Sequence, residues 1–166
     1  MGYNLIIGNA VLKYDADDPR VWIEAERAEH PEAPDHDDFV RKTNSRSPSY
    51  TAWHGFCREA GIYELFYGQG WDRDSRSYRQ CSEEFHRETP LLKEHPGAQP
   101  ILPQDLEYVR AARIKRERTN GGKGPGFWAD DGVDNGTDPT LARLLWLEFW
   151  MGWALTNCPM PIIENS

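Results

Sequence analysis

The sequence contains little cysteine and no long apolar run. Among its 166 residues there are three cysteines, at positions 57, 81 and 158. An odd number of cysteines in a chain large enough to fold unaided argues against a disulfide framework and predicts free thiols in a reducing compartment. The longest apolar stretch, Leu144 to Leu155, is interrupted by a glutamate and a glycine and is too short to span a bilayer. No secretory leader is recognisable. We therefore expect a cytoplasmic protein that does not enter membranes.

A complete catalytic or metal-binding motif is also missing. The glycine-rich stretch around Lys123 has no hydroxyl residue after the lysine, which a phosphate-binding P-loop requires. A calcium loop of the EF-hand type needs glycine at its sixth position, and neither Asp130 nor Asp134 as first ligand provides it. Two interpretations remain. Asp130, Asp134 and Asp138 form an irregular cation site, or they belong to turns before a helix that Thr137 or Asp138 caps.

What the sequence does contain is aromatic surface and negative charge. Seven Trp, seven Tyr and six Phe are enough to drive folding, and 166 residues match one domain, so we expect residues 1–166 to form a single domain. The formal net charge is −8. An acidic globule repels polyanions, which argues against long nucleic acid as a partner.

The residue pattern predicts strands at both ends of the chain. Tyr3–Leu12 and Val21–Ala28 are apolar or alternating segments on either side of the turn residues Asp15–Pro19, which predicts an antiparallel hairpin. Pro161–Asn165 is expected to be a last strand. Because the order of elements is not an alternating βαβ pattern, we expect an α+β fold with a small antiparallel sheet packed against about four helices.

The helices are predicted from caps and breakers. Ser47-Pro48 is expected to cap a helix that ends at Gly61, and Pro103 opens one that continues to about Arg118. The polar segment Arg73–Glu88 is predicted to be helical. The strongest helix begins at Asp138-Pro139.

That last helix is apolar on almost every side. Trp146, Phe149, Trp150 and Trp153 share one face, and leucine, methionine and alanine residues share another. A helix of this kind is normally buried on all sides, so we expect it to be the central core helix. The alternative, an aromatic platform that stacks on sugars or bases, requires exposed rings.

Two His/Cys pairs suggest a zinc site. His54 and Cys57 lie three apart on a predicted helix, and Cys81 and His86 follow about two dozen residues later. Four such ligands could close a tetrahedral site. Alternatively, Cys57 belongs to the aromatic stripe of its helix and is a small buried hydrophobe, or it forms a nucleophilic pair with His54. A hydrolase or a metal-dependent enzyme would use one of these arrangements or the aspartates above.

The only strongly basic segment lies on the helix that begins at Pro103. We expect Leu106, Val109 and Ile114 to face inward, so that Arg113 and Arg116 point outward and form a positive patch with Lys123. Such a patch would bind an acidic protein surface or a phosphate group; the alternative is an ordinary solvated helix face. His95, before Pro96-Gly97, is held in a predicted turn, where it could serve a site or be a surface residue.

Three segments resemble small uncharacterised proteins of tailed-phage and prophage genomes. They are the opening MGYNLIIGNAVL, the turn HPGAQPI and the tryptophan-rich ARLLWLEFWMGWAL. The resemblance brings no catalytic motif and no functional residues. Together with the acidic charge and the segregated basic segment, it favours a non-enzymatic interaction protein that binds a host or virion protein.

Overall fold

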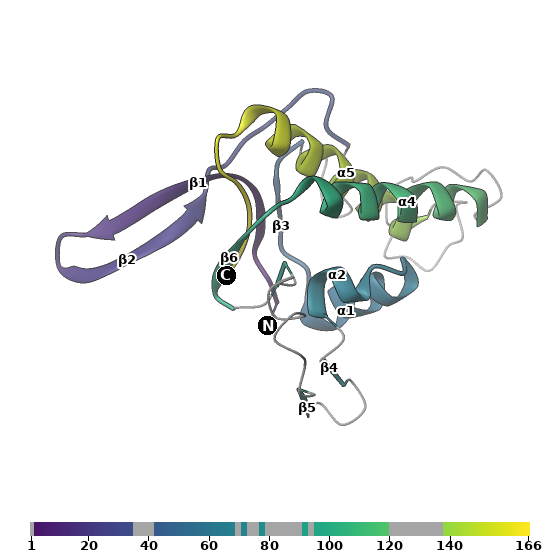
Figure 1. Ribbon diagram of the computed structural model, residues 1–166, viewed down its shortest axis with the longest axis horizontal. Coiled ribbons are helices and arrows are strands. Elements are labelled where there is room, and N and C mark those ends of the chain that lie inside the picture. The colour runs from purple at the N-terminus through teal and green to yellow at the C-terminus, as the bar shows by residue number, and fades with distance from the viewer. Residues whose placement is uncertain are drawn as a thin grey trace.

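The computed structural model describes residues 2–34, 42–68, 71–72, 77–78, 91–92, 95–119 and 138–166. The fold is α+β, as predicted (Figure 1). In chain order the elements are β1 (Leu5–Asp15), β2 (Asp18–Ala25), β3 (Ser45–Arg46), α1 (Tyr50–Glu59), α2 (Tyr63–Tyr67), β4 (Trp71–Asp72), β5 (Ser77–Tyr78), β6 (Gly97–Pro100), α4 (Pro103–Thr119), α5 (Pro139–Asn157) and β7 (Pro161–Asn165).

The main sheet is built around β1. Its strand order is β2-β1-β7-β6, with β3 also paired to β1, and every pairing is antiparallel. The predicted hairpin and the predicted last strand are both confirmed, although the hairpin register pairs Ala10 with Ala25 and continues to Asp15. The sheet curls, because β2 also approaches β6 and β7.

Helix α5 is the core helix that the sequence predicts. Asp138 caps it by accepting hydrogen bonds from the backbone of Thr140 and Leu141, and Pro139 occupies the first turn. Trp146 and Trp150 are completely buried, whereas Phe149 and Trp153 are partly buried against the same core. The helix packs on β1, β7, α1 and α4, which is why it is apolar on several faces.

The other helices follow the predicted breakers with one shift. Helix α1 is capped by Ser49 rather than by Ser47, because the Ser49 hydroxyl accepts from the backbone of Ala52. The chain leaves α1 at Gly61, whose φ of 72° favours glycine. Helix α4 begins at Pro103 as predicted and lies along α5 (Figure 1).

The prediction of a polar helix over Arg73–Glu88 is wrong for the part of that segment that the structure describes. Ser77 and Tyr78 form strand β5, paired antiparallel with Trp71 and Asp72 of β4. Ser77 and Tyr78 are as compatible with a strand as with a polar helix. The segment shows no apolar periodicity that would distinguish the two structures. The rest of that segment lies outside the described residues.

Candidate protein-interaction surface

The distal half of the β1–β2 hairpin extends away from the body of the molecule (Figure 1). Strand β7 pairs with β1 only as far as Asn9, and β2 pairs with β1 from Ala10 onward. Beyond that point no other strand of the described residues lies beside these two. We call residues 10–25 the arm.

One face of the arm is apolar and open to solvent. Leu12 lies opposite Ile23 and Tyr14 lies opposite Val21, and directly opposed residues of an antiparallel pair share a face. Their exposed fractions are 64% for Leu12, 44% for Ile23, 79% for Tyr14 and 63% for Val21. Single exposed apolar residues are normal, but a contiguous group of this kind marks an interaction site.

The apolar face of the arm continues a buried cluster at its root. Ala10 and Ala25, the next opposed pair on this face, pack with Ile6 and Ile162 where the sheet curls. The same face is therefore covered at the root and uncovered along the arm. A partner segment placed along the arm would extend an existing apolar cluster rather than start a new one.

The arm has a different character on its other face and at its tip. Lys13, opposite Trp22, and Glu24 lie on the second face, where the Trp22 indole donates to Glu24 over 2.8 Å. The tip carries three carboxylates, of which Asp18 is paired with Arg20. The Arg20 guanidinium lowers the pKa of Asp18. With three carboxylates and one guanidinium, the tip is acidic.

Asn44 fixes the root of the arm. Its side chain donates to the carbonyls of Ile7 (2.9 Å) and Glu26 (2.7 Å) and accepts from the backbone of Ala28 (2.9 Å). Gly8 makes room for this bridge, because a Cβ there would lie 2.5 Å from the Glu26 oxygen and 3.1 Å from the Asn44 amide nitrogen. One buried amide therefore joins β1 to the chain leaving β2 and sets the direction of the arm.

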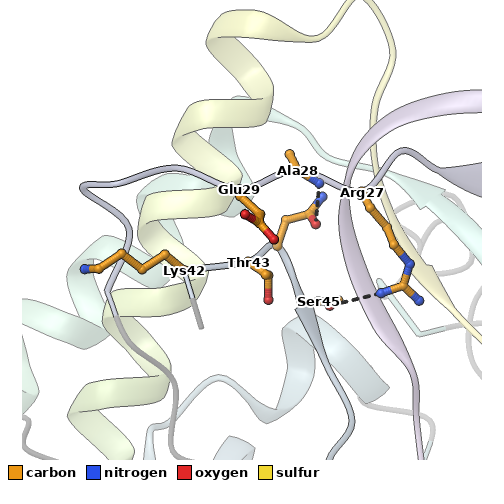
Figure 2. Close-up of a pocket in the computed structure, with 7 residues that line it drawn as sticks. Arg27, Ala28, Glu29, Lys42, Thr43 and Ser45 are labelled. Carbon is orange, nitrogen blue, oxygen red and sulfur yellow. Dashed lines mark hydrogen bonds between the residues drawn. The ribbon is translucent and has the colours of Figure 1, made fainter. Parts of the chain in front are cut away.

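A hollow of about 730 Å³ lies beside this bridge, between the chain leaving β2 and the chain entering β3. Figure 2 shows the residues that line it. Its lining is mixed in charge. Arg27 donates to the Ser45 hydroxyl, and Lys42, which points away from the other labelled side chains, donates to the Ala33 carbonyl. Both cations thus donate hydrogen bonds within the chain, and the hollow forms a polar border at the root of the arm.

The structure describes only half of the predicted zinc ligands. His54 stacks on Tyr67 with 3.9 Å between ring centroids, and Cys57 is completely buried in the core. Burial raises the pKa of the Cys57 thiol well above its ordinary value, whereas a nucleophilic or metal-binding cysteine needs a lowered one. Cys81 and His86 lie outside the described residues. The described part contains no cluster of three or more His, Cys, Asp or Glu side chains with the arrangement of a metal site.

Asp138 is the one described member of the predicted aspartate site. It is buried, caps α5 and accepts two hydrogen bonds from Arg116, the shorter of 2.7 Å. This matches the capping interpretation. Asp130 and Asp134 lie outside the described residues.

The outward orientation predicted for Arg113 and Arg116 is wrong. Arg113 forms two hydrogen bonds with Glu148 of α5, the shorter of 2.6 Å, and Arg116 pairs with Asp138. Of the three residues predicted to face inward, Val109 is buried and Leu106 packs partly buried against the core, but Ile114 is exposed. The spacing of apolar residues predicted that Val109 is buried. It gave no sign that Glu148 of α5 and Asp138, which caps α5, would lie beside α4 and pair with the two arginines. Both arginines therefore join α4 to α5, and Lys123 lies outside the described residues.

No family model, curated protein or solved structure matches this chain. None of the helices in the described ranges has the length and apolar character needed to cross a membrane.

The exposed face of the arm was not identified from the sequence, although its residues alternate clearly. Leu12 and Tyr14, and Val21 and Ile23, show the period of two that is typical of any half-buried strand. Alternation predicts that one face is apolar but not whether another layer covers it. Only the early end of β7, at Asn9, reveals that this part of the hairpin is uncovered.

Proposed function

We propose that this chain is a non-enzymatic, phage-encoded interaction protein that acts in the cytoplasm by binding a host or virion protein through the arm. The observation that carries the proposal is the run of four exposed apolar side chains on one face of a projecting hairpin. Exposed apolar area of this kind contributes nothing to folding and is stabilising only when a partner removes it from water. The phage origin and the location rest on the sequence alone.

The partner surface that fits is an extended segment with apolar and basic residues. β2 is an edge strand, so an extended segment can pair with its free backbone edge and place alternate side chains beside Val21 and Ile23. The acidic tip favours lysine or arginine near those side chains. A second copy fits less well, because each chain carries a net charge of −8 and both tips are acidic.

A displayed library of random peptides tests this directly. Peptides are selected on the immobilised chain, and those that also bind Leu12→Ser/Ile23→Ser are removed. We expect enriched peptides with alternating apolar residues and neighbouring lysine or arginine. Synthetic copies should bind the chain 1:1, bind the double variant at least about tenfold more weakly, and weaken as salt is raised.

The matched control is Lys13→Ser/Glu24→Ser, which changes the opposite face and leaves the net charge unchanged. It should bind the selected peptides like the unmodified chain. Peptides that bind all three proteins equally would overturn the proposal. So would self-association in sedimentation, or binding to neutral phosphatidylcholine vesicles, if either is lost in Leu12→Ser/Ile23→Ser, because the arm would then serve a second copy or a lipid surface.

A further inference from the structure

A second group of polar side chains gathers where the two ends of the sheet meet α1. Tyr50 is the first residue of α1, His95 lies just before β6, and Asn165 is the last residue of β7. The Tyr50 hydroxyl lies 2.8 Å from His95 Nε2, and His95 Nδ1 lies 2.8 Å from Asn165 Oδ1. Residues distant in sequence thus form one continuous chain of hydrogen bonds.

The direction of these hydrogen bonds follows from their donors and acceptors. Asn165 Oδ1 can only accept, so His95 Nδ1 carries the ring proton. In the neutral imidazole, Nε2 is then an acceptor, and the Tyr50 hydroxyl donates to it. This is the order of groups in an activated nucleophile: an attacking hydroxyl, a base within hydrogen-bond reach, and a third group that orients the base.

The group is rigid and yet reachable. The Tyr3 ring packs edge-on against both Tyr50 and His95, with ring centroids 4.7 Å and 5.3 Å apart, which holds the two rings in place. His95 is exposed and Tyr50 is partly exposed, whereas Asn165 is completely buried. The Asn165 Nδ2 group has no hydrogen-bond partner in the described part of the chain. A buried amide nitrogen without a hydrogen-bond partner lowers the stability of the fold. Such a group is typical of a functional site.

We propose that Tyr50 is a nucleophilic tyrosine that accepts an acyl group from a small neutral ester, with His95 as its base and Asn165 as a positioning residue. The phenol oxygen bonds to the carbonyl carbon of an aryl ester, the bond from that carbon to the aryl oxygen breaks, the aryloxide leaves, and the phenol proton passes to His95 Nε2. A neutral electrophile fits because the side-chain hydrogen bonds and ring contacts of Tyr50, His95 and Asn165 in the described part of the chain involve only neutral groups. The transfer occurs once per chain. It does not depend on binding of a partner by the arm.

The probe for this site is p-nitrophenyl acetate, and Tyr14 is an internal reference. Tyr14 is far more exposed than Tyr50 and makes no hydrogen bond through its hydroxyl among the described residues. We expect release of about one equivalent of p-nitrophenolate and an acetyl group on Tyr50 in peptide mass spectra. Acetylation at Tyr50 should be at least about tenfold faster than at Tyr14.

Four variants separate the roles of the three residues. Tyr50→Phe should abolish the fast release, and His95→Gln, at an exposed position, should slow Tyr50 acetylation to the rate of Tyr14. Asn165→Leu should also slow it, and Asn165→Asp, which again accepts from Nδ1, should restore it. Fast release that persists in Tyr50→Phe would place the reactivity on another group and overturn the proposal. Equal rates at Tyr50 and Tyr14 would reduce the group to a structural tie between α1 and the sheet.

Discussion

Asn44 shows how much of this fold depends on single polar side chains. A buried asparagine is stabilising only when its amide is paired, and both atoms of the Asn44 amide have partners on two different segments of the chain. Gly8 is required by the same contact, because any Cβ would collide with a backbone oxygen. The arm's position relative to the body is thus determined by two residues that do not belong to its exposed face.

Replacing Asn44 with alanine should therefore be costly. The change removes three buried or partly buried hydrogen bonds to backbone groups and should lower the free energy of unfolding by about 3 kcal/mol. Urea unfolding followed by circular dichroism measures it. Asn157→Ala is the matched control, because that amide makes one exposed bond at the end of α5, and it should cost less than about 1 kcal/mol. Equal losses in the two variants would contradict the role of Asn44.

Trp150 tests the core at the same scale. It is completely buried in α5, so Trp150→Ala should leave a cavity and lower the free energy of unfolding by about 3–5 kcal/mol. Trp22→Ala is the control, since Trp22 is 41% exposed on the arm, and it should change stability by less than about 1 kcal/mol. If Trp150→Ala unfolds at the same urea concentration as the unmodified chain, α5 is not the core helix.

At the scale of elements, β1 belongs to two different environments. Its first half lies in the centre of the sheet under α5, whereas its second half has only β2 beside it. A two-stranded ribbon without a covering layer is marginally stable in water. The covered half of the hairpin is therefore expected to be more stable against local opening than the arm.

Amide hydrogen exchange should show this difference along one strand. The amide of Ile7, which donates to Asn44 in the covered half, should exchange at least about tenfold more slowly than the amides of Val11 and Lys13 in the arm. Two-dimensional NMR in deuterated buffer measures each amide. Uniform protection from Ile7 to Lys13 would mean that the arm is covered by something, and the proposed free face would be wrong.

The contact between α4 and α5 combines apolar packing with ion pairs. Arg113 and Arg110 both donate to Glu148, and Arg113 is the main reason that the pKa of Glu148 is lowered. A carboxylate whose folded-state pKa lies below its unfolded value adds stability above the unfolded pKa, near 4.5, and loses it as the pH falls toward the folded pKa.

Glu148→Gln should therefore be destabilising in a pH-dependent way. Its deficit in unfolding free energy relative to the unmodified chain should be full at pH 7 and should shrink below about pH 4.5. Urea unfolding at several pH values measures the deficit. Glu107→Gln is the control, because Glu107 forms an exposed pair within α4, and its effect should be small at every pH. A Glu148→Gln deficit that does not change between pH 7 and pH 3 would contradict the ion-pair contribution.

For the whole molecule, local rules predicted the elements, and contacts between distant segments determined the sites. The hairpin, α4, α5 and β7 follow from alternation, caps and prolines that lie within each segment. The partners of Arg113 and the meeting of Tyr50, His95 and Asn165 depend on packing across the chain, with separations of 35, 45 and 70 residues. Periodicity carries no information on such separations, so those arrangements could not be predicted.

The arm should also dominate the surface properties of the whole molecule. Among the described residues it carries five of the nine large apolar side chains that are exposed, and four of the five share one face. Leu12→Ser/Ile23→Ser should elute markedly earlier from a hydrophobic interaction column, while its thermal midpoint stays within about 3 °C, because these side chains contribute little to folding. Lys13→Ser/Glu24→Ser, on the opposite face, should elute like the unmodified chain. Unchanged retention of the first variant would mean that the apolar face is covered in solution, and a large loss of thermal stability would mean that it packs against the chain's own body.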